Sequence, residues 1–340
     1  MTPRTPPRAP RATVPADARA ARRAVLDHVL ALVADAPWSG GLVLRGSMVL
    51  AAWAPGAARE PADLDWIVLD GAVGVDPLDP YPYVDRLATV QQWPEAAGGA
   101  ARYEIWGEEE FGTGGCRPLL PPEGLHWVYD EDGDAFETAV PPYQDLLDRV
   151  ARWPRAAPGV RLAADAARTD GTWTYGHYDT PGVRLVIPWH AEGLPPGEVQ
   201  LDFARDECLP ESPVWTLVPR GDGGPPTAVR TASRELSLAW KLLWLHTDSR
   251  GDGGARGKDL YDAVVLAELD GVDLSPRLLH KVLRGTPDGA PDSFSSLEPA
   301  GWDVDWAEFR NRNPWVTGTA RHWLDRLVRA LGPVLGERPR

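Results

Sequence analysis

The amino-acid sequence predicts an α+β fold, in which strands and helices are followed by a helical C-terminal part. Two segments predict the strands. Residues 41–69 have the pattern of strand, turn, helix and strand, and residues 172–204 have the pattern of a hairpin with one further strand. Two apolar helices are expected at 233–246 and 258–266. With 43% hydrophobic content in 340 residues, the chain can bury a sizeable core, in one elaborated domain or two closely packed ones.

The N-terminus and the composition exclude several classes of protein. Residues 1–23 are rich in Pro, Ala and Arg and lack the apolar stretch of a signal peptide, so we expect a basic segment, flexible at its start, and no export. No apolar run approaches the length that spans a membrane, so no membrane partner is expected. Cys116 and Cys208 are too few for a disulfide framework, which favours a cytoplasmic location.

The formal net charge of −14 weighs against a broad nucleic-acid-binding surface, because phosphate contacts depend on clustered Lys and Arg. A local basic patch remains open near the C-terminus, where the expected helix 319–329 carries basic residues beside Trp323. An amphipathic surface helix is the commoner explanation of this pattern, and contact with RNA is the alternative.

A first helix is expected at 16–34, and a short strand at 41–45 follows it. The turn Gly46-Ser47 then leads into an expected helix at 48–53. Glycine lets the backbone approach a ligand closely, the helix N-terminus favours negative charge, and the serine hydroxyl can donate a hydrogen bond. Gly46 and Ser47 are therefore candidates for holding a phosphate, although a Gly-Ser pair alone is usually only a turn.

Asp63 and Asp65 stand at the head of the apolar strand 66–69. Alternate side chains of a strand share a face, so the two carboxylates are expected to project together. Such a pair suits Mg²⁺, which takes oxygen ligands and keeps positions for water and substrate phosphates. A lone pair of this kind is most often a solvated strand end, but its order and spacing after Gly46-Ser47 favour a functional site.

Pro- and Gly-rich stretches divide the middle of the chain, since Pro fixes φ and removes a hydrogen-bond donor. Loops or insertion edges are expected at residues 76–82, 112–124, 154–159 and 219–226. Strand-forming residues at 172–178 and 183–189 predict a hairpin that turns at 180–182.

A further strand is expected at 198–204, where apolar residues alternate with Gln200 and Asp202. Asp202 therefore lies on the face opposite the apolar residues. A third carboxylate there could bind metal or take the proton from an attacking hydroxyl. An exposed acid on a half-buried strand explains the pattern equally well.

The helix 233–246, with Ser233 as its N-cap, is apolar almost all round and includes Lys241. A buried ammonium is costly unless anions pair with it, and a bound triphosphate would supply them. The chain uses Lys only at positions 241, 258 and 281 among 35 basic residues, which favours a functional Lys241 over one that reaches solvent at the helix margin. The next helix carries Asp259 in its first turn, where an acid also favours the helix dipole.

Taken together, these motifs resemble the AbiEii/AbiGii toxin family of nucleotidyltransferases. The matching segments are Leu44-Arg45-Gly46-Ser47, Arg59 with Asp63-Leu64-Asp65, the helix with Lys241, and Lys258-Asp259-Leu260-Tyr261-Asp262. The resemblance spans roughly residues 40 to 270, with unmatched insertions. It implies a polymerase-β-like nucleotidyltransferase core, a mixed twisted sheet with helices, followed by a helical C-terminal part. The implied boundaries are 24–218 for the core and 229–335 for the helical domain with Lys241 and Asp259.

The resemblance also implies residue roles. Gly46 and Ser47 match the phosphate-binding turn, and Asp63 and Asp65 match the metal pair. Arg59 matches the basic residue that usually precedes the metal pair. Lys241 matches the helical lysine, and Asp259 matches the essential acid of the last motif. The chain departs from the pattern at Arg45, where a second glycine is frequent, at Pro61, where Ser or Thr is usual, and at Lys258, where Arg is common. None of these departures removes an expected metal ligand.

The expected activity is Mg²⁺-dependent transfer of a nucleoside monophosphate from an NTP to an acceptor hydroxyl. Asp63, Asp65 and Asp202 would hold the metal, Gly46, Ser47, Arg59 and Lys241 would bind the nucleotide, and Lys241, Asp259 and Asp202 would act in catalysis. Through the resemblance, the acceptor is a tRNA, and the protein is a toxin of a toxin–antitoxin or phage-defence system with a cognate antitoxin protein as partner. Transfer to a protein or a small molecule, or a non-catalytic nucleotide-binding module, are the alternatives.

Overall fold

The structure is a computed structural model, and it describes residues 17–36, 38–69, 143–170, 182–204, 209–249, 254–284 and 299–332. Several predicted features lie outside these residues. They are the loops at 76–82 and 112–124, the hairpin arm at 172–178, most of the hairpin turn, Cys116 and Cys208.

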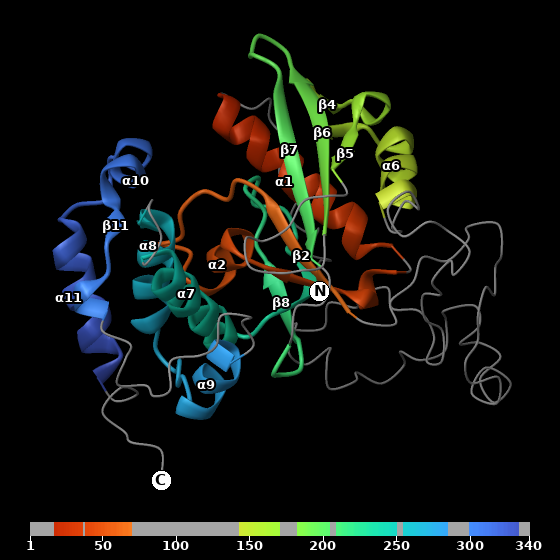
Figure 1. Ribbon diagram of the computed structural model, residues 1–340. Coiled ribbons are helices and arrows are strands. Elements are labelled where there is room, and N and C mark those ends of the chain that lie inside the picture. The colour runs from red at the N-terminus through yellow and green to blue at the C-terminus, as the bar shows by residue number, and fades with distance from the viewer. Residues whose placement is uncertain are drawn as a thin grey trace, which may run out of the picture.

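A large mixed sheet forms the centre of the molecule (Figure 1). Within the described ranges it has nine strands, and eight of them follow the order β3-β4-β6-β7-β2-β1-β9-β8, while β5 pairs with β6. The strands are β1 (Leu42–Arg45), β2 (Leu64–Val68), β3 (Arg155–Ala157), β4 (Val160–Leu162), β5 (Arg168–Asp170), β6 (Val183–Ala191), β7 (Gly197–Ala204), β8 (Val214–Val218) and β9 (Thr227–Thr231). β2 is antiparallel to β1 and parallel to β7, so segments far apart in the sequence meet at β2.

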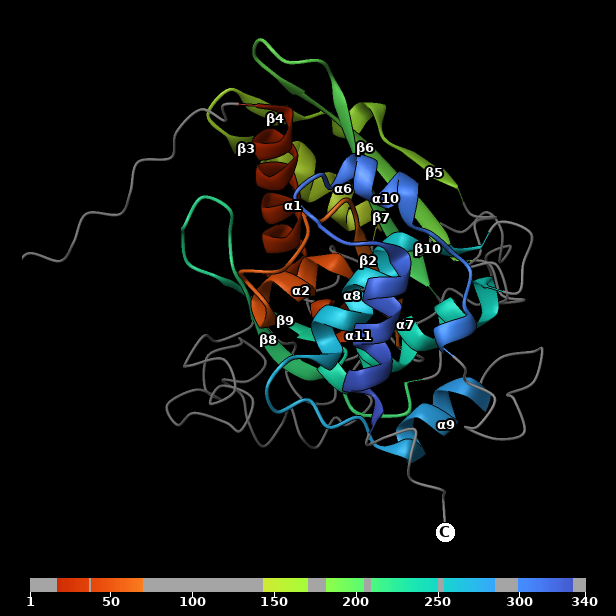
Figure 2. The ribbon, with the colours of Figure 1, turned by 90° about the vertical axis from the view of Figure 1, so that its left-hand side faces the viewer.

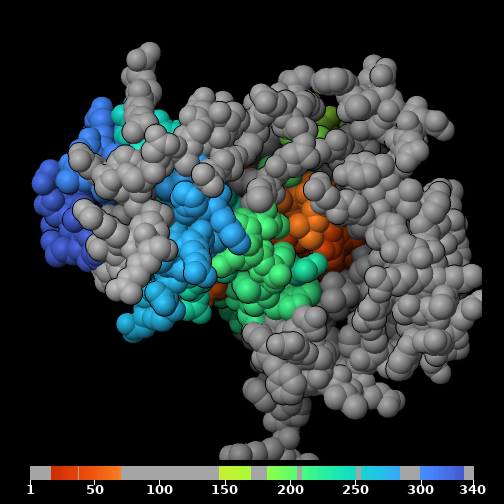
Figure 3. Space-filling view, turned by 60° about the horizontal axis from the view of Figure 1, so that its bottom comes forward, coloured from red at the N-terminus to blue at the C-terminus, as the bar shows by residue number. Residues whose placement is uncertain are grey.

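The helices divide into two groups. α1 (Ala18–Ala34) and α6 (Tyr143–Arg152) lie with the sheet, and α2 (Ser47–Trp53) connects β1 to β2. The C-terminal helices are α7 (Arg234–Asp248), α8 (Gly257–Ala267), α9 (Pro276–Arg284), α10 (Trp306–Arg312) and α11 (Ala320–Ala330). They gather on one side of the molecule, where the short parallel strands β10 (Ala255–Arg256) and β11 (Val304–Asp305) also lie (Figure 2). In the space-filling view the blue C-terminal helices form one end, and green strands and orange N-terminal elements lie toward the other (Figure 3).

The sheet separates two hydrophobic cores. Leu44, Trp66 and Phe203 belong to the core that contains α1. Val43 and Ile67, their neighbours on the same strands, belong to the core built with α7, α8 and α11. Since successive side chains of a strand point to opposite faces, each face of β1 and β2 is covered by a different set of helices. Odd-numbered positions of these two strands therefore face the C-terminal helices.

The predicted fold class is confirmed: the protein is a mixed α+β protein with a helical C-terminal part. Of the loop or insertion edge predicted at 154–159, the loop was wrong for Arg155–Ala157, which forms edge strand β3 next to Pro154, and right for residues 158–159, which form the turn to β4. The predicted loop at 219–226 lies between β8 and β9. The domain boundaries 24–218 and 229–335 stay a prediction. None of the described helices combines the length and the apolarity that crossing a bilayer takes.

Candidate active site

The turn after β1 requires a glycine for two reasons. Gly46 has φ 81° and ψ −157°, a backbone conformation that L side chains rarely adopt. In addition, a Cβ at this position would lie 2.5 Å from Oδ2 of Asp65. The predicted phosphate turn and the predicted metal carboxylate are therefore in direct proximity, with nothing larger than a hydrogen between them.

Ser47 begins α2 and is only 2% exposed. Its Oγ has no hydrogen-bond partner among the described groups. Buried hydroxyls are normally hydrogen-bonded, so an unpartnered one beside a glycine turn is the arrangement expected where a ligand or a water completes the site.

The carboxylates meet across neighbouring strands. Asp63 directly precedes β2, and Asp65 lies within it beside its register partner Asp202 on β7. Burial and, after it, the charge of Asp65 raise the pKa of Asp63 to about 6. The cations Lys258 and Arg59 act in the opposite direction. A carboxyl group crowded by like charge has a strong electrostatic reason to bind a cation.

Asp202 is buried, so the interpretation of it as an exposed acid was wrong. Its carboxylate accepts two hydrogen bonds from the guanidinium of Arg184, at 2.8 and 2.9 Å, and one from Gln200 Nε2 at 2.9 Å. Burial raises the pKa of Asp202, and the hydrogen bond from Arg184 opposes that rise. The third carboxylate is therefore near the pair, as predicted, but it is held by an arginine.

These residues form one charged row across four neighbouring strands. The row consists of Arg45 on β1, Asp65 on β2, Asp202 on β7 and Arg184 on β6, each the register partner of the next. Register partners point to the same face of a sheet. Two acids thus lie side by side at the centre of the row, with one arginine at each end.

Lys241 on α7 is buried, so it does not reach solvent at the helix margin. Its Nζ donates to Asp259 Oδ1 at 2.6 Å and lies 3.4 Å from Asp262 Oδ2, both on α8. Burial lowers the pKa of Lys241, but the charges of Asp259 and Asp262 outweigh it and the net pKa is raised. Burial raises the pKa of Asp259, and Lys241 reverses this to a net lowering. The anions that the buried ammonium requires are thus supplied by the protein itself.

Arg59, on the segment between α2 and β2, is tied to the same network. Its Nε and Nη2 donate to the two carboxylate oxygens of Asp262 at 2.9 Å each. Burial lowers the pKa of Arg59, but the charge of Asp262 and its hydrogen bonds outweigh this effect. The net pKa is raised, so the guanidinium stays ionised. Tyr261 adds a second attachment of this segment to α8, since its hydroxyl donates to the carbonyl of Ala57 at 2.6 Å.

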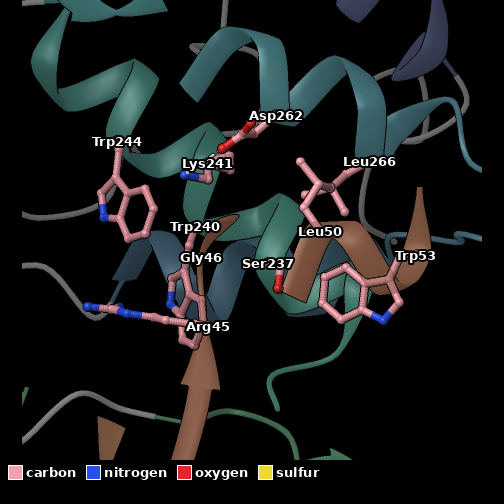
Figure 4. Close-up of a pocket in the computed structure, with 10 residues that line it drawn as sticks. All are labelled: Arg45, Gly46, Leu50, Trp53, Ser237, Trp240, Lys241, Trp244, Asp262 and Leu266. Atoms are coloured by element: carbon pink, nitrogen blue, oxygen red, sulfur yellow. Dashed lines mark ion pairs between the residues drawn. The ribbon is translucent and has the colours of Figure 1, made fainter. Parts of the chain in front are cut away.

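A pocket adjoins the glycine turn, between the end of β1, α2, α7 and α8 (Figure 4). It encloses about 320 Å³, open solvent included, and its lining residues are Arg45, Gly46, Leu50, Trp53, Ser237, Trp240, Lys241, Trp244, Asp262 and Leu266. The Arg45 guanidinium carbon lies 5.4 Å from the ring centre of Trp240 and 5.5 Å from that of Trp244. Arg45, which stands where the family often has glycine, therefore packs against the tryptophans of α7.

The donor set fits a magnesium ion held partly by its substrate. No group of three or more His, Cys, Asp or Glu side chains within the described ranges is arranged to hold a metal. Mg²⁺ is nevertheless commonly bound through one or two carboxylates together with substrate phosphates. Asp63 and Asp65, crowded by like charge next to the turn at Gly46, meet this requirement.

The basic residues near the C-terminus are largely paired. Arg312 contacts Glu308, Arg321 contacts Asp325, and Arg326 contacts Glu268. Trp323 is buried against Tyr261 and Trp306, with ring centres 4.9 and 5.5 Å apart. This geometry is that of an amphipathic helix packed on the core, the commoner of the two interpretations of this segment.

Some site residues were not assigned by sequence reasoning. Asp262 was part of a motif without a role, although its spacing from Asp259 places both on adjacent turns of α8. To assign Arg184 to the site, one needs the register of β6 against β7, and the sequence pattern does not specify it.

Comparison with known proteins assigns the chain to a family. A family model described as "Nucleotidyl transferase AbiEii toxin, Type IV TA system" matches residues 139–321, more than half of the chain. The matched region includes Asp202, Lys241 and Asp259 and begins after the Gly46 turn, Asp63 and Asp65. A search of curated proteins found no match. The chain belongs to the AbiEii family of nucleotidyltransferase toxins of type IV toxin–antitoxin systems.

Proposed function

We propose that the protein is a Mg²⁺-dependent nucleotidyltransferase that moves a nucleoside monophosphate from an NTP to an acceptor hydroxyl. The observation that supports this most is the close approach of the Gly46 turn to Asp65, with Asp202 on the adjoining strand. A phosphate on the turn would thereby lie next to the carboxylates. The topology, in which β2 joins β1 on one side and β7 on the other, supports a polymerase-β-like core.

In the proposed reaction the acceptor oxygen forms a bond to the α-phosphorus, and the bond from that phosphorus to the bridging oxygen breaks. Pyrophosphate leaves with the electron pair. Mg²⁺, bound by Asp63 and Asp65, would supply charge neutralisation and alignment of the reacting oxygens. Backbone N–H groups of the turn and Ser47 Oγ would hold the β- and γ-phosphates.

Lys241 and Asp259 enter the proposal as a pair. Lys241 donates one of its three ammonium hydrogen bonds to Asp259, which fixes the position of Nζ at the pocket wall. Nζ would then donate to the leaving pyrophosphate and offset its developing charge. Arg59 would act through Asp63, since its guanidinium charge lowers the pKa of that carboxyl.

The proton of the acceptor hydroxyl requires a base. Asp202 is the candidate on the strand next to the metal pair, where it could take the proton or bind metal. In the present arrangement both of its oxygens accept hydrogen bonds from Arg184, which compete with either role.

For the acceptor we propose a tRNA, and for the biological role a toxin of a toxin–antitoxin or phage-defence system that acts in the cytoplasm and is countered by an antitoxin protein. Support comes from the family match. The net charge of −14 and the paired C-terminal arginines favour a protein or small-molecule acceptor as the second candidate.

Incubation with each α-³²P-labelled NTP, Mg²⁺ and total tRNA, followed by a denaturing gel, tests the proposal. We expect label on tRNA with wild type and none with Asp65→Asn. Retained transfer by the variant would refute the metal assignment. Label on protein would move the acceptor to the second candidate, and metal-dependent NTP binding without transfer to any acceptor would support a binding module.

A cell-based test addresses the toxin role separately. Expression of wild type should arrest growth, and Asp63→Ala should relieve the arrest while protein levels stay equal. A wild type that leaves growth unchanged would contradict toxicity but not nucleotidyl transfer.

A further inference from the structure

The pairing of Asp202 with Arg184 is a feature that the proposed reaction does not use. The two side chains form a fork, with Nε to Oδ1 at 2.8 Å and Nη2 to Oδ2 at 2.9 Å. The Asp202 side chain is 4% exposed, whereas that of Arg184 is 31% exposed. Planar fork geometry is the strongest form of ion pair between these residue types.

The surroundings of Asp202 explain why it needs a cation. It is buried, and its neighbour in the row, Asp65, carries the same charge. A buried carboxylate beside another is unfavourable unless a positive group compensates it. Arg184 supplies that charge from the opposite side, on β6. It therefore compensates the charge of Asp202, as a divalent cation on the other side would.

The two partners differ in their exposure to solvent. Asp202 lies within β7, between β2 and β6, and is held additionally by Gln200. Arg184 has a long, flexible side chain that already reaches solvent. The guanidinium is therefore accessible from solvent, and a phosphate of an arriving nucleotide would offer it a new bidentate partner.

We propose that Arg184 is a positioning residue that holds Asp202 away from the metal, so that a divalent cation first binds through Asp63 and Asp65 and gains Asp202 only when Arg184 is displaced. This inference rests on the proposed function of the same site.

The test is Mn²⁺ binding to the full-length protein without nucleotide, measured by electron paramagnetic resonance of the free ion. Arg184→Gln removes the charge and should tighten Mn²⁺ binding about tenfold, within the range of coupling in one ion-pair network. Arg168→Gln is the matched control. Arg168, on β5, also donates two hydrogen bonds to one carboxylate, that of Glu198 on β7, but both of these side chains are exposed. Its loss should leave Mn²⁺ affinity unchanged.

A double-mutant cycle separates recruitment of Asp202 from simple loss of positive charge. With Asp202→Asn in the background, Arg184→Gln should change Mn²⁺ affinity by less than about threefold, because no carboxylate is released. An equal gain in both backgrounds, or no gain in either, would overturn the inference. Arg184→Lys, which keeps the charge without the fork, should bind Mn²⁺ with intermediate affinity and serves if Arg184→Gln does not fold by circular dichroism.

The same assay distinguishes this inference from the proposed function. If Asp65→Asn abolishes Mn²⁺ binding and Arg184→Gln leaves it unchanged, the metal assignment stands and the role of Arg184 is refuted. If wild type does not bind Mn²⁺, both the metal assignment and the role of Arg184 fail.

Discussion

Replacement of Asp63 by Asn should stabilise the metal-free protein, although it removes a proposed metal ligand. The carboxyl has a pKa of about 6 in the folded protein and an ordinary value of 3.8. Each pKa unit corresponds to ~1.4 kcal/mol, so the ionised group costs up to ~3 kcal/mol of folding free energy at neutral pH. Because the Asp63 side chain is partly exposed, solvent screens part of this electrostatic cost. We therefore expect Asp63→Asn to raise the free energy of unfolding by ~1–2 kcal/mol.

The pH dependence gives the sign of the effect. As the pH rises, the unfolded chain loses this proton near pH 3.8 and the folded chain only near pH 6. The unfavourable contribution of Asp63 to stability is therefore absent below about pH 4 and grows between about pH 4 and pH 6. Above about pH 6 it stays constant. The advantage of Asp63→Asn should follow the same course: largest above about pH 6 and absent below about pH 4.

Urea unfolding at several pH values, with a chelator present, measures this difference. A variant no more stable than wild type at pH near 7, or an advantage that does not change with pH, would refute the reasoning. Added Mg²⁺ should raise the stability of wild type more than that of Asp63→Asn, since a ligand stabilises only the state that binds it. Asp222→Asn is a control of opposite sign, because the hydrogen bond from Arg220 lowers the pKa of Asp222 to about 2. Loss of this carboxylate should lower the stability by less than ~1 kcal/mol.

Three further outcomes are expected. Gly46→Ala places a methyl group 2.5 Å from Oδ2 of Asp65 at a φ of 81°, so urea unfolding should show a loss of ~1–3 kcal/mol and nucleotide transfer should become undetectable; wild-type transfer rates would contradict the close approach. Lys241→Met leaves Asp259 charged and buried without its 2.6 Å partner and should cost ~3–5 kcal/mol of stability. Addition of Asp259→Asn should restore most of this loss. An equal loss in the single and the double variant would argue against the pair. Gly197→Ala brings a Cβ within 2.2 Å of an indole carbon and should lower the thermal midpoint through a loss of ~1–3 kcal/mol, and an unchanged midpoint would show that the ring can move aside.

Local patterns predicted much of this structure because they depend on neighbouring residues. The alternation around Asp202 placed it on the face opposite the apolar residues, and Ser233 caps α7 by accepting from Leu236 N, as expected for its position before an apolar helix. The turn at Gly46 was found because strand, glycine and helix follow one another directly in the sequence.

What the sequence did not reveal depends on contacts between distant segments. The pairing of β2 with β7, and of β6 with β7, decides that Asp202 meets Asp65 on one side and Arg184 on the other. A pattern with a period of two residues assigns faces but not partners. Likewise, the apolar helix α7 predicted burial of Lys241, but only the packing of α8 against it shows that Asp259 and Asp262 compensate the charge.

The attachment of the segment before β2 to α8 has a consequence for synthesis of the protein. Arg59 and Ala57 precede the proposed metal ligands, and their partners Asp262 and Tyr261 are made about two hundred residues later. A growing chain that has emerged only as far as the sheet therefore lacks the groups that hold this segment. The proposed nucleotidyl transfer should begin only after α8 has left the ribosome and folded, so incomplete chains should lack this activity.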